Sequence, residues 1–338
     1  MKPLWDLNAF VSSYWGMYVV QSVLHSVIAL TLVESAFLAW NVKEPRAKQR
    51  FRFLVILLPV VSYPVYQLLS PRRGDVYFRL DTLFDSNRWL FFEVWEGLPL
   101  MVFFGGVLGI TSLVFFVQEV LPMLMHTLER TRSSGEEPEE AEDPGHLRKV
   151  SEALADLPFD EEGVTILDDE DLVLFSSTGL RPRIFVSTGL LEAFDTEHLQ
   201  VAFAHEIGHI QRSRRPLLIF AYLFRVAMFF SPLAMIEFRR LAQEEEMVCD
   251  EIAVGLTGKP ERLVEAIEML RPTPEDYDTA EGGQSVRAMA SSLEQYSQDV
   301  LLKSRILSIE QAERDETPWS IPYGVTLVLI IGINYFVV

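Results

Sequence analysis

Long apolar runs separated by polar segments dominate the hydrophobic pattern of the chain. A membrane-spanning helix needs about 20 mostly apolar residues. Stretches that approach or reach this length lie at residues 14–40, 53–70, 97–117 and 319–338. Within the first stretch, His25 and Glu34 are costly in hydrocarbon, so we expect both side chains to face other helices or to lie near an interface. The pattern therefore predicts an α-helical membrane protein.

Between the third and the last apolar stretch, the pattern changes to that of a small mixed domain. Short β-branched and aromatic runs predict strands at residues 164–167, 172–177 and 183–187. A helix should start after Phe194 and Asp195, with Asp195 as the N-cap and Phe194 packing against Leu199. The sequence thus predicts a small sheet that precedes a capped helix.

The predicted boundaries follow from these changes in pattern. Three transmembrane helices occupy residues 1–126, an acidic flexible linker residues 127–147, a mixed domain residues 148–318, and a fourth transmembrane helix residues 319–338. The linker contains GEEPEEAEDPG, in which acidic residues crowd between glycines and prolines, as is typical of a solvated connection.

Basic residues indicate how the chain is oriented in the membrane. The short loop after the first span is rich in lysine and arginine, which favours the cytoplasmic side. These residues are Lys43, Arg46, Lys48, Arg50 and Arg52. Counting the spans forward places residues 71–96 outside, the mixed domain in the cytoplasm and the carboxyl terminus outside.

Composition supports this picture and excludes one class of partner. The hydrophobic fraction of 49% is high for a soluble chain of 338 residues. A formal net charge of −19 argues against binding to nucleic acid. The single cysteine, Cys249, excludes an internal disulfide and fits a reducing cytoplasm.

The predicted capped helix carries a candidate metal motif. His205, Glu206 and His209 form the pattern HExxH. Two histidines four residues apart lie on one helix face, so their ring nitrogens can converge on one Zn²⁺ ion, and the glutamate can reach a metal-bound water. The alternative is a pair of solvent-facing histidines, but the capped helix behind a set of strands favours the metal site.

A catalytic zinc site needs a third protein ligand and one open position. No histidine follows His209 in the sequence, which points to a carboxylate within residues 243–254. We favour Glu246 as this ligand and Asp250, one turn later, as the acceptor for the spare N–H of a ligating histidine. The remaining acids of this run are expected on a solvated face, namely Glu244, Glu245 and Glu251.

The apolar segment at residues 216–236 lies between the HExxH motif and Glu246. A full crossing here would separate Glu246 from the histidines by about 30 Å of hydrocarbon. We therefore expect the segment to return to the side it left, with Arg225 and Ser231-Pro232 supplying the break. A membrane-dipping hairpin and a pair of helices packed on the other spans both remain open.

The segments HEIGHIQRSRRPLL, FFSPLAMIEFRRLAQEEEMVCDEIAV and LLKSRILSI resemble the membrane zinc metallopeptidases of the BlaR/MecR type. The resemblance implies an α+β, zincin-like metalloprotease domain between the third and fourth spans. It also implies that His205, His209 and Glu246 bind zinc, Glu206 is the catalytic base and Asp250 supports the site. The HEIGH and RPRIFVSTGLL segments also resemble HtpX-type and CaaX prenyl proteases. The beta-lactam receptors continue into an extracellular sensor, whereas this sequence ends at Val338, so antibiotic sensing by that route is not expected.

We accordingly expect hydrolysis of peptide bonds at the cytoplasmic surface of the cell membrane. Substrates would be a cytoplasmic regulator or a membrane protein, cut at one site in signalling. Alternatives are an HtpX-like quality-control protease and a non-catalytic receptor or scaffold with structural zinc. An intact Glu206 favours the enzyme, because a structural site needs no base. Whether the chain forms a homo-oligomer is left open.

Three further expectations concern residues around the candidate site. A peptide would lie along residues 183–187 if that strand forms a sheet edge. The developing oxyanion could be stabilised by Arg305, Tyr296 or Arg287, although a salt-bridge or packing role is the simpler interpretation. His198, two turns before His205, is expected on the surface.

Overall fold

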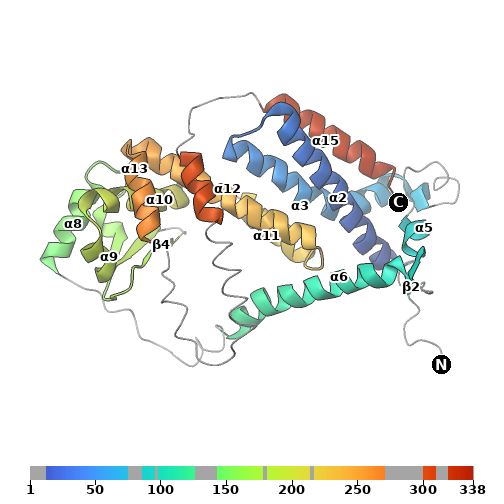
Figure 1. Ribbon diagram of the computed structural model, residues 1–338, viewed down its shortest axis with the longest axis horizontal. Helices are drawn as coiled ribbons and strands as arrows, with labels where there is room; N and C mark the ends of the chain where they lie inside the picture. The colour runs from blue at the N-terminus through green and yellow to red at the C-terminus, as the bar shows by residue number, and fades with distance from the viewer. Residues whose placement is uncertain are drawn as a thin grey trace. The chain divides into compact units, whose positions relative to one another are not determined.

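The computed structural model describes residues 13–74, 86–95, 98–125, 143–177, 181–213, 217–270, 300–309 and 319–337 (Figure 1). The chain divides into two compact units. Residues 1–134, 217–244 and 315–338 form the first unit, and residues 135–216 and 245–314 form the second. Each unit has hydrophobic clusters of its own.

The first unit is built mainly from apolar helices. They are α2 (Tyr14–Trp40), α3 (Pro45–Leu69), α6 (Leu100–Phe115) and α15 (Ser320–Tyr335). A π-helical turn, Phe116–Val120, extends α6, so that the helical stretch continues to Met125. Short elements between α3 and α6 are the 3-10 turn Pro71–Gly74, α5 (Ser86–Leu90), β1 (Glu93–Trp95) and β2 (Leu98–Pro99).

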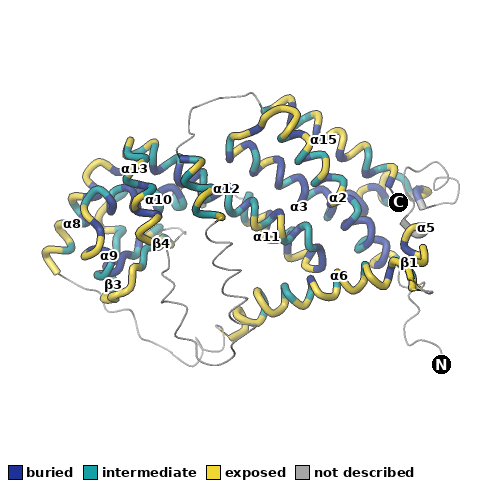
Figure 2. The backbone as a smooth tube through the Cα atoms, in the orientation of Figure 1, coloured by how far each residue is buried: buried dark blue, intermediate teal, exposed yellow. Residues whose placement is uncertain are grey.

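Three of these helices are long and apolar enough to cross a membrane: Tyr14–Trp40, Pro45–Leu69 and Leu100–Met125. The first predicted span has the observed bounds, whereas the second helix begins eight residues earlier than predicted, because Pro45 occupies a first-turn position where no N–H is needed. The last apolar helix, α15, has 16 residues and is shorter than the predicted fourth span. Most of α6 is exposed (Figure 2), as expected for a helix surrounded by lipid.

Helices α2 and α3 pack against each other through Ala29, Val33, Phe51 and Val55. His25 and Glu34 of the first span face neighbouring helices, which is one of the two predicted placements. The His25 Nδ1 atom lies 3.0 Å from Ser62 Oγ of α3. A Glu34 carboxylate oxygen lies 3.2 Å from Nη1 of Arg52, also on α3. These contacts place the costly groups between helices.

Within the apolar segment at residues 216–236, the described residues form two helices with a turn between them. Helix α11 (Leu217–Ala227) ends before the turn, and α12 (Pro232–Thr257) starts at the predicted proline. The break therefore lies at Ser231-Pro232. The expectation that Arg225 contributes to the break is wrong, because Arg225 lies within α11. Its guanidinium is buried and lies 2.7 Å from a carboxylate oxygen of Glu119.

The second unit contains a three-stranded sheet formed by β3 (Val164–Leu167), β4 (Leu174–Ser177) and β5 (Arg183–Ser187). The strand order is β3-β5-β4, with β5 parallel to β3 and antiparallel to β4. The expectation that residues 183–187 form a sheet edge is wrong, because β5 pairs on both sides. Among the described strands, β4 and β3 are the edges.

Helices complete the second unit: α8 (Pro144–Leu154), α9 (Thr188–Ala193), α10 (Thr196–Ser213), the second part of α12, and α13 (Pro260–Met269). A 3-10 turn (Glu161–Gly163) precedes β3, and residues 300–309 are helical. Asp195 caps α10 as predicted, since its Oδ1 accepts a hydrogen bond from the His198 backbone N–H at 2.8 Å. Phe194 and Leu199 are both buried in the hydrophobic cluster beneath α10.

Candidate metal centre

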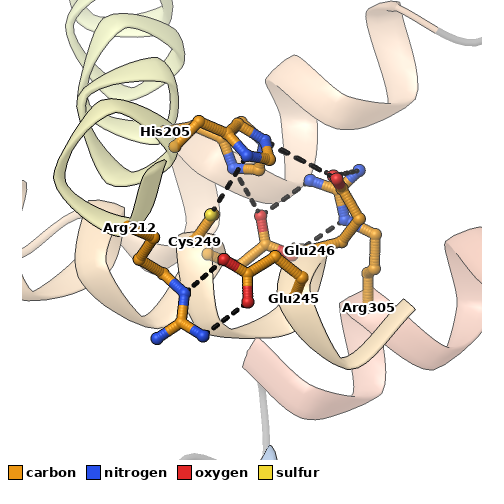
Figure 3. Close-up of polar contacts among 8 residues, drawn as sticks. His205, Arg212, Glu245, Glu246, Cys249 and Arg305 are labelled. Atoms are coloured by element: carbon orange, nitrogen blue, oxygen red, sulfur yellow. Dashed lines mark hydrogen bonds and ion pairs between the residues drawn. The ribbon is translucent and has the colours of Figure 1, made fainter. Parts of the chain in front are cut away.

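Helix α10 has a glycine where it approaches α12 closely. A Cβ atom added to Gly208 would lie 3.3 Å from the Cα, Cβ and backbone oxygen atoms of Cys249. On α10, Gly208 lies between His205 and His209; on α12, Cys249 lies between Glu246 and Asp250. The crossing therefore brings the predicted site residues of two distant segments together (Figure 3).

The three predicted ligands bring their donor atoms close together, within 4.8 Å of one another. The Nε2 atoms of His205 and His209 are 3.2 Å apart. The Glu246 carboxylate places one oxygen 3.5 Å from Nε2 of His205 and the other 3.6 Å from Nε2 of His209. Tetrahedral zinc ligands with bonds of about 2.0–2.2 Å are about 3.3–3.5 Å apart. The donor set and its spacing therefore fit a zinc ion, and no second group of this kind occurs in the described part of the chain.

Asp250 lies behind His205, as predicted. Its Oδ1 is 2.9 Å from Nδ1 of His205, and the carboxylate is buried. Such a partner would fix the ring and leave Nε2 free for a metal ion. Asp250 is itself held by Arg305, whose Nε and Nη2 atoms lie 2.8 and 2.7 Å from its two oxygens. Nη1 of Arg305 lies 3.5 Å from Glu246, so the guanidinium contacts two acidic residues of the site.

Arg305 was one of three candidates for oxyanion stabilisation. Its bidentate contact with Asp250 favours the salt-bridge role, in which Arg305 holds the residue that contacts His205. The only signal for this role in the sequence was the segment LLKSRILSI, which contains Arg305. The other two candidates, Arg287 and Tyr296, lie outside the described residues.

The charged groups of the site shift one another's pKa values. Burial lowers the pKa of His205, but hydrogen bonds with Asp250 and Glu246 outweigh this effect and raise it to about 9. Burial raises the pKa of Asp250, and hydrogen bonds from Arg305 and His205 bring it below its usual value. For Glu246, burial is likewise outweighed by His205, His209 and Arg305, so the pKa is lowered. Both carboxylates are therefore ionised near neutral pH, as metal ligation and support require.

Glu206 follows the first histidine on α10 and is nearly buried, with 9% of its surface exposed. Within the described ranges, its carboxylate takes part in no hydrogen bond or ion pair. Buried carboxylates are usually paired, because desolvation disfavours the charged form. An uncommitted carboxylate on the residue directly after His205 is suited to accept a proton from a substrate water.

Two acids of the predicted solvated face are instead buried. Glu244 and Glu245 are each 6% exposed. Glu245 forms an ion pair with Arg212 of α10 (Figure 3). A Glu244 oxygen lies 3.6 Å from Nε of Arg52 on α3, and both residues belong to the first unit. The prediction fails because α12 is covered on more than one face, which the local charge pattern does not reveal.

His198 also differs from expectation. It is 9% exposed and therefore not a surface residue. Its two ring nitrogens lie 2.9 Å from Asp195 Oδ1 and 3.0 Å from Glu265 Oε2. The side chain links the start of α10 to α13 and takes no part in the metal centre.

Part of the chain matches a known protein family. The family described as BlaR1 peptidase M56 matches residues 174–270, from β4 to the end of α13. The matched segment includes HExxH, Glu246 and Asp250, and it confirms the resemblance found in the sequence. The family supports a membrane metallopeptidase, in agreement with the apolar helices and the small sheet. No curated protein matches the chain.

Proposed function

From the match of residues 174–270 to the BlaR1 peptidase M56 family, we propose that the protein is a membrane-embedded zinc metalloendopeptidase. The observation that carries this proposal is the convergence of His205, His209 and Glu246, whose donor atoms all lie within 4.8 Å of one another. Glu206, with its uncommitted carboxylate, lies next to this group in the sequence. A structural zinc site would usually be closed by a fourth protein ligand, and the described residues supply three.

The roles of the residues follow from their surroundings. A zinc ion at this site would supply Lewis-acid activation of a peptide carbonyl and of the attacking water. Glu206 accepts the proton of the water during attack and delivers it to the departing amine. Asp250 holds the ring of His205, and Arg305 holds Asp250. These contacts keep the donor atoms in place between turnovers.

The substrate would bind as an extended peptide along β4, not along β5 as the sequence suggested. Strand β4 lies at the edge of the described sheet and packs against α10, the helix that carries HExxH. An edge strand offers free N–H and C=O groups, so it can pair with the main chain of a peptide of any sequence. A peptide paired with β4 would therefore lie next to α10, the helix that bears the histidines.

The membrane arrangement is proposed from the apolar helices and the basic loop. Three helices are suited to span the bilayer, and the basic loop after α2 favours a cytoplasmic metal-binding unit and an outside carboxyl terminus. Helix α11 would contact lipid through its exposed apolar face, which includes Phe220 and Leu223. Its only charged residue, Arg225, is buried against Glu119 and thus hidden from that face.

Variants with one introduced cysteine test this arrangement, because the native Cys249 is buried and should not react. A nitroxide label on Leu223→Cys should collide with oxygen more than with a water-soluble nickel chelate, whereas a label on exposed Glu152→Cys of α8 should show the opposite. Glu152→Cys should also resist a membrane-impermeant maleimide in intact cells and react after permeabilisation. Nickel access at Leu223 equal to that at Glu152 would contradict the lipid contact. Labelling of Glu152→Cys in intact cells would contradict the cytoplasmic orientation.

The biological role is proposed to be cleavage of a regulatory or membrane protein at one site, in signalling. Comparing intact peptides from cells that contain the native protein or Glu206→Gln tests this role. One regulator cut once supports signalling. Many fragments of membrane proteins would instead indicate a quality-control protease. Identical peptide profiles would favour a non-catalytic receptor or scaffold.

A further inference from the structure

The two histidines of the candidate metal centre have different partners at Nδ1, the ring nitrogen that faces away from the converging donor atoms. His205 has the carboxylate of Asp250 at its Nδ1 atom. The Nδ1 atom of His209 instead lies 3.4 Å from Sγ of Cys249. Within the described residues, no carboxylate takes the equivalent place behind His209. A metal-binding histidine usually donates its second N–H to a carboxylate, a carbonyl or a water, so the thiol is an unusual partner.

The sulfur is placed to orient the ring and is not among the converging donor atoms. Nε2 of His209 faces Glu246 at 3.6 Å, and the two nitrogens of an imidazole ring point in different directions. Cys249 contacts the other nitrogen, and its sulfur is not part of the donor group. Figure 3 shows a dashed line from the sulfur of Cys249 to the histidine pair.

The position of the thiol is fixed by its surroundings. Cys249 is fully buried, with 0% of its surface exposed. Its backbone lies at the close crossing with Gly208, the residue directly before His209. The crossing therefore sets the distance between the thiol and the ring, and a side chain anchored in this way can hold the ring without large movement of its own.

We propose that Cys249 is a positioning residue for His209, in which the thiol sulfur accepts a hydrogen bond from the Nδ1–H group. This hydrogen bond selects the tautomer that leaves Nε2 free for the metal. The inference rests on the proposed zinc site and assigns no catalytic step to the thiol. It gives the site an asymmetry: the charged pair Arg305–Asp250 holds His205, whereas a neutral and weaker acceptor holds His209.

The test uses the full-length protein loaded with Co²⁺, whose visible absorption reports the geometry of its ligands. Cys249→Ala removes the acceptor, and we expect an altered cobalt spectrum and a loss of metal to a chelator about 10-fold or more faster, as for other outer partners of ligating histidines. Cys249→Ser keeps an acceptor at this position. It should restore the native spectrum and a rate of metal loss within about threefold of the native one.

Val248→Ala is the matched control, because Val248 is equally buried and adjacent on α12 but has no polar atom. It should lower the melting temperature and leave the cobalt spectrum unchanged. The proposal is overturned if Cys249→Ala keeps the native spectrum and metal affinity, if Cys249→Ser behaves like Cys249→Ala, or if Val248→Ala changes the spectrum equally. Failure of the native protein to bind Co²⁺ or Zn²⁺ at all would instead overturn the proposed metal centre.

Discussion

Glu206→Gln is expected to abolish peptide cleavage while leaving the metal bound. The amide has nearly the same shape as the carboxylate but cannot accept the proton of the attacking water. General-base catalysis contributes about 10²- to 10⁴-fold. The value of kcat/KM should therefore decrease by a factor in this range, or cleavage should become undetectable. Cleavage of an unfolded membrane substrate, or of the protein itself, gives the rate, and elemental analysis gives the zinc content.

Glu197→Gln supplies the control on the same helix. Glu197 lies in the first turn of α10 and forms exposed ion pairs with Lys259 and Arg262, each at 3.0 Å. Its removal should change cleavage by less than about threefold, as is usual for exposed ion pairs. If Glu206→Gln cleaves as fast as the native protein, Glu206 is not the catalytic base and the proposed mechanism is wrong, even when zinc is present.

Glu246→Ala is expected to lose both the metal and the activity. The substitution leaves two histidine donors, which is one protein ligand fewer than catalytic zinc sites have. Replacement of outer partners already costs about 10- to 100-fold in affinity, so loss of a direct ligand should exceed 100-fold. Competition with a chromophoric chelator measures the affinity, and the same preparation gives the cleavage rate.

Glu251→Ala tests whether the loss is specific to the donor group. Glu251 is also on α12, but it does not belong to the three converging residues. Its variant should bind zinc with native affinity. Retention of zinc by Glu246→Ala would show that the third ligand is a different group, whereas equal losses in both variants would point to a general disturbance of α12.

The sequence predicted the local parts of this site well, because their signals are local. The four-residue spacing of His205 and His209 places both on one helix face, and Asp195 marks where that helix starts. The same spacing places Glu246 and Asp250 on one face of α12. The structure brings these residues together, and their roles as ligands remain predictions.

Contacts between distant segments were harder to predict. Arg305 approaches Asp250 from 55 positions further along the chain, and no periodicity links the two. The order of the strands also depends on pairing at a distance, which is why β5 was expected at the edge but lies in the centre. The charge pattern predicts a solvated Glu245, but in the structure its carboxylate forms an ion pair with Arg212 of another helix.

The contact between Gly208 and the backbone of Cys249 has a consequence for how the site can vary among related chains. Main-chain atoms, not the sizes of neighbouring side chains, set the separation of the histidine pair from the acidic pair. Hydrophobic residues around the crossing can therefore change with little effect on the spacing of the donor atoms. A methyl group at position 208 would lie 3.3 Å from Cys249, so the neighbouring atoms would have to shift by a few tenths of an ångström to admit it. Variation at this position should therefore be more restricted than in the surrounding core.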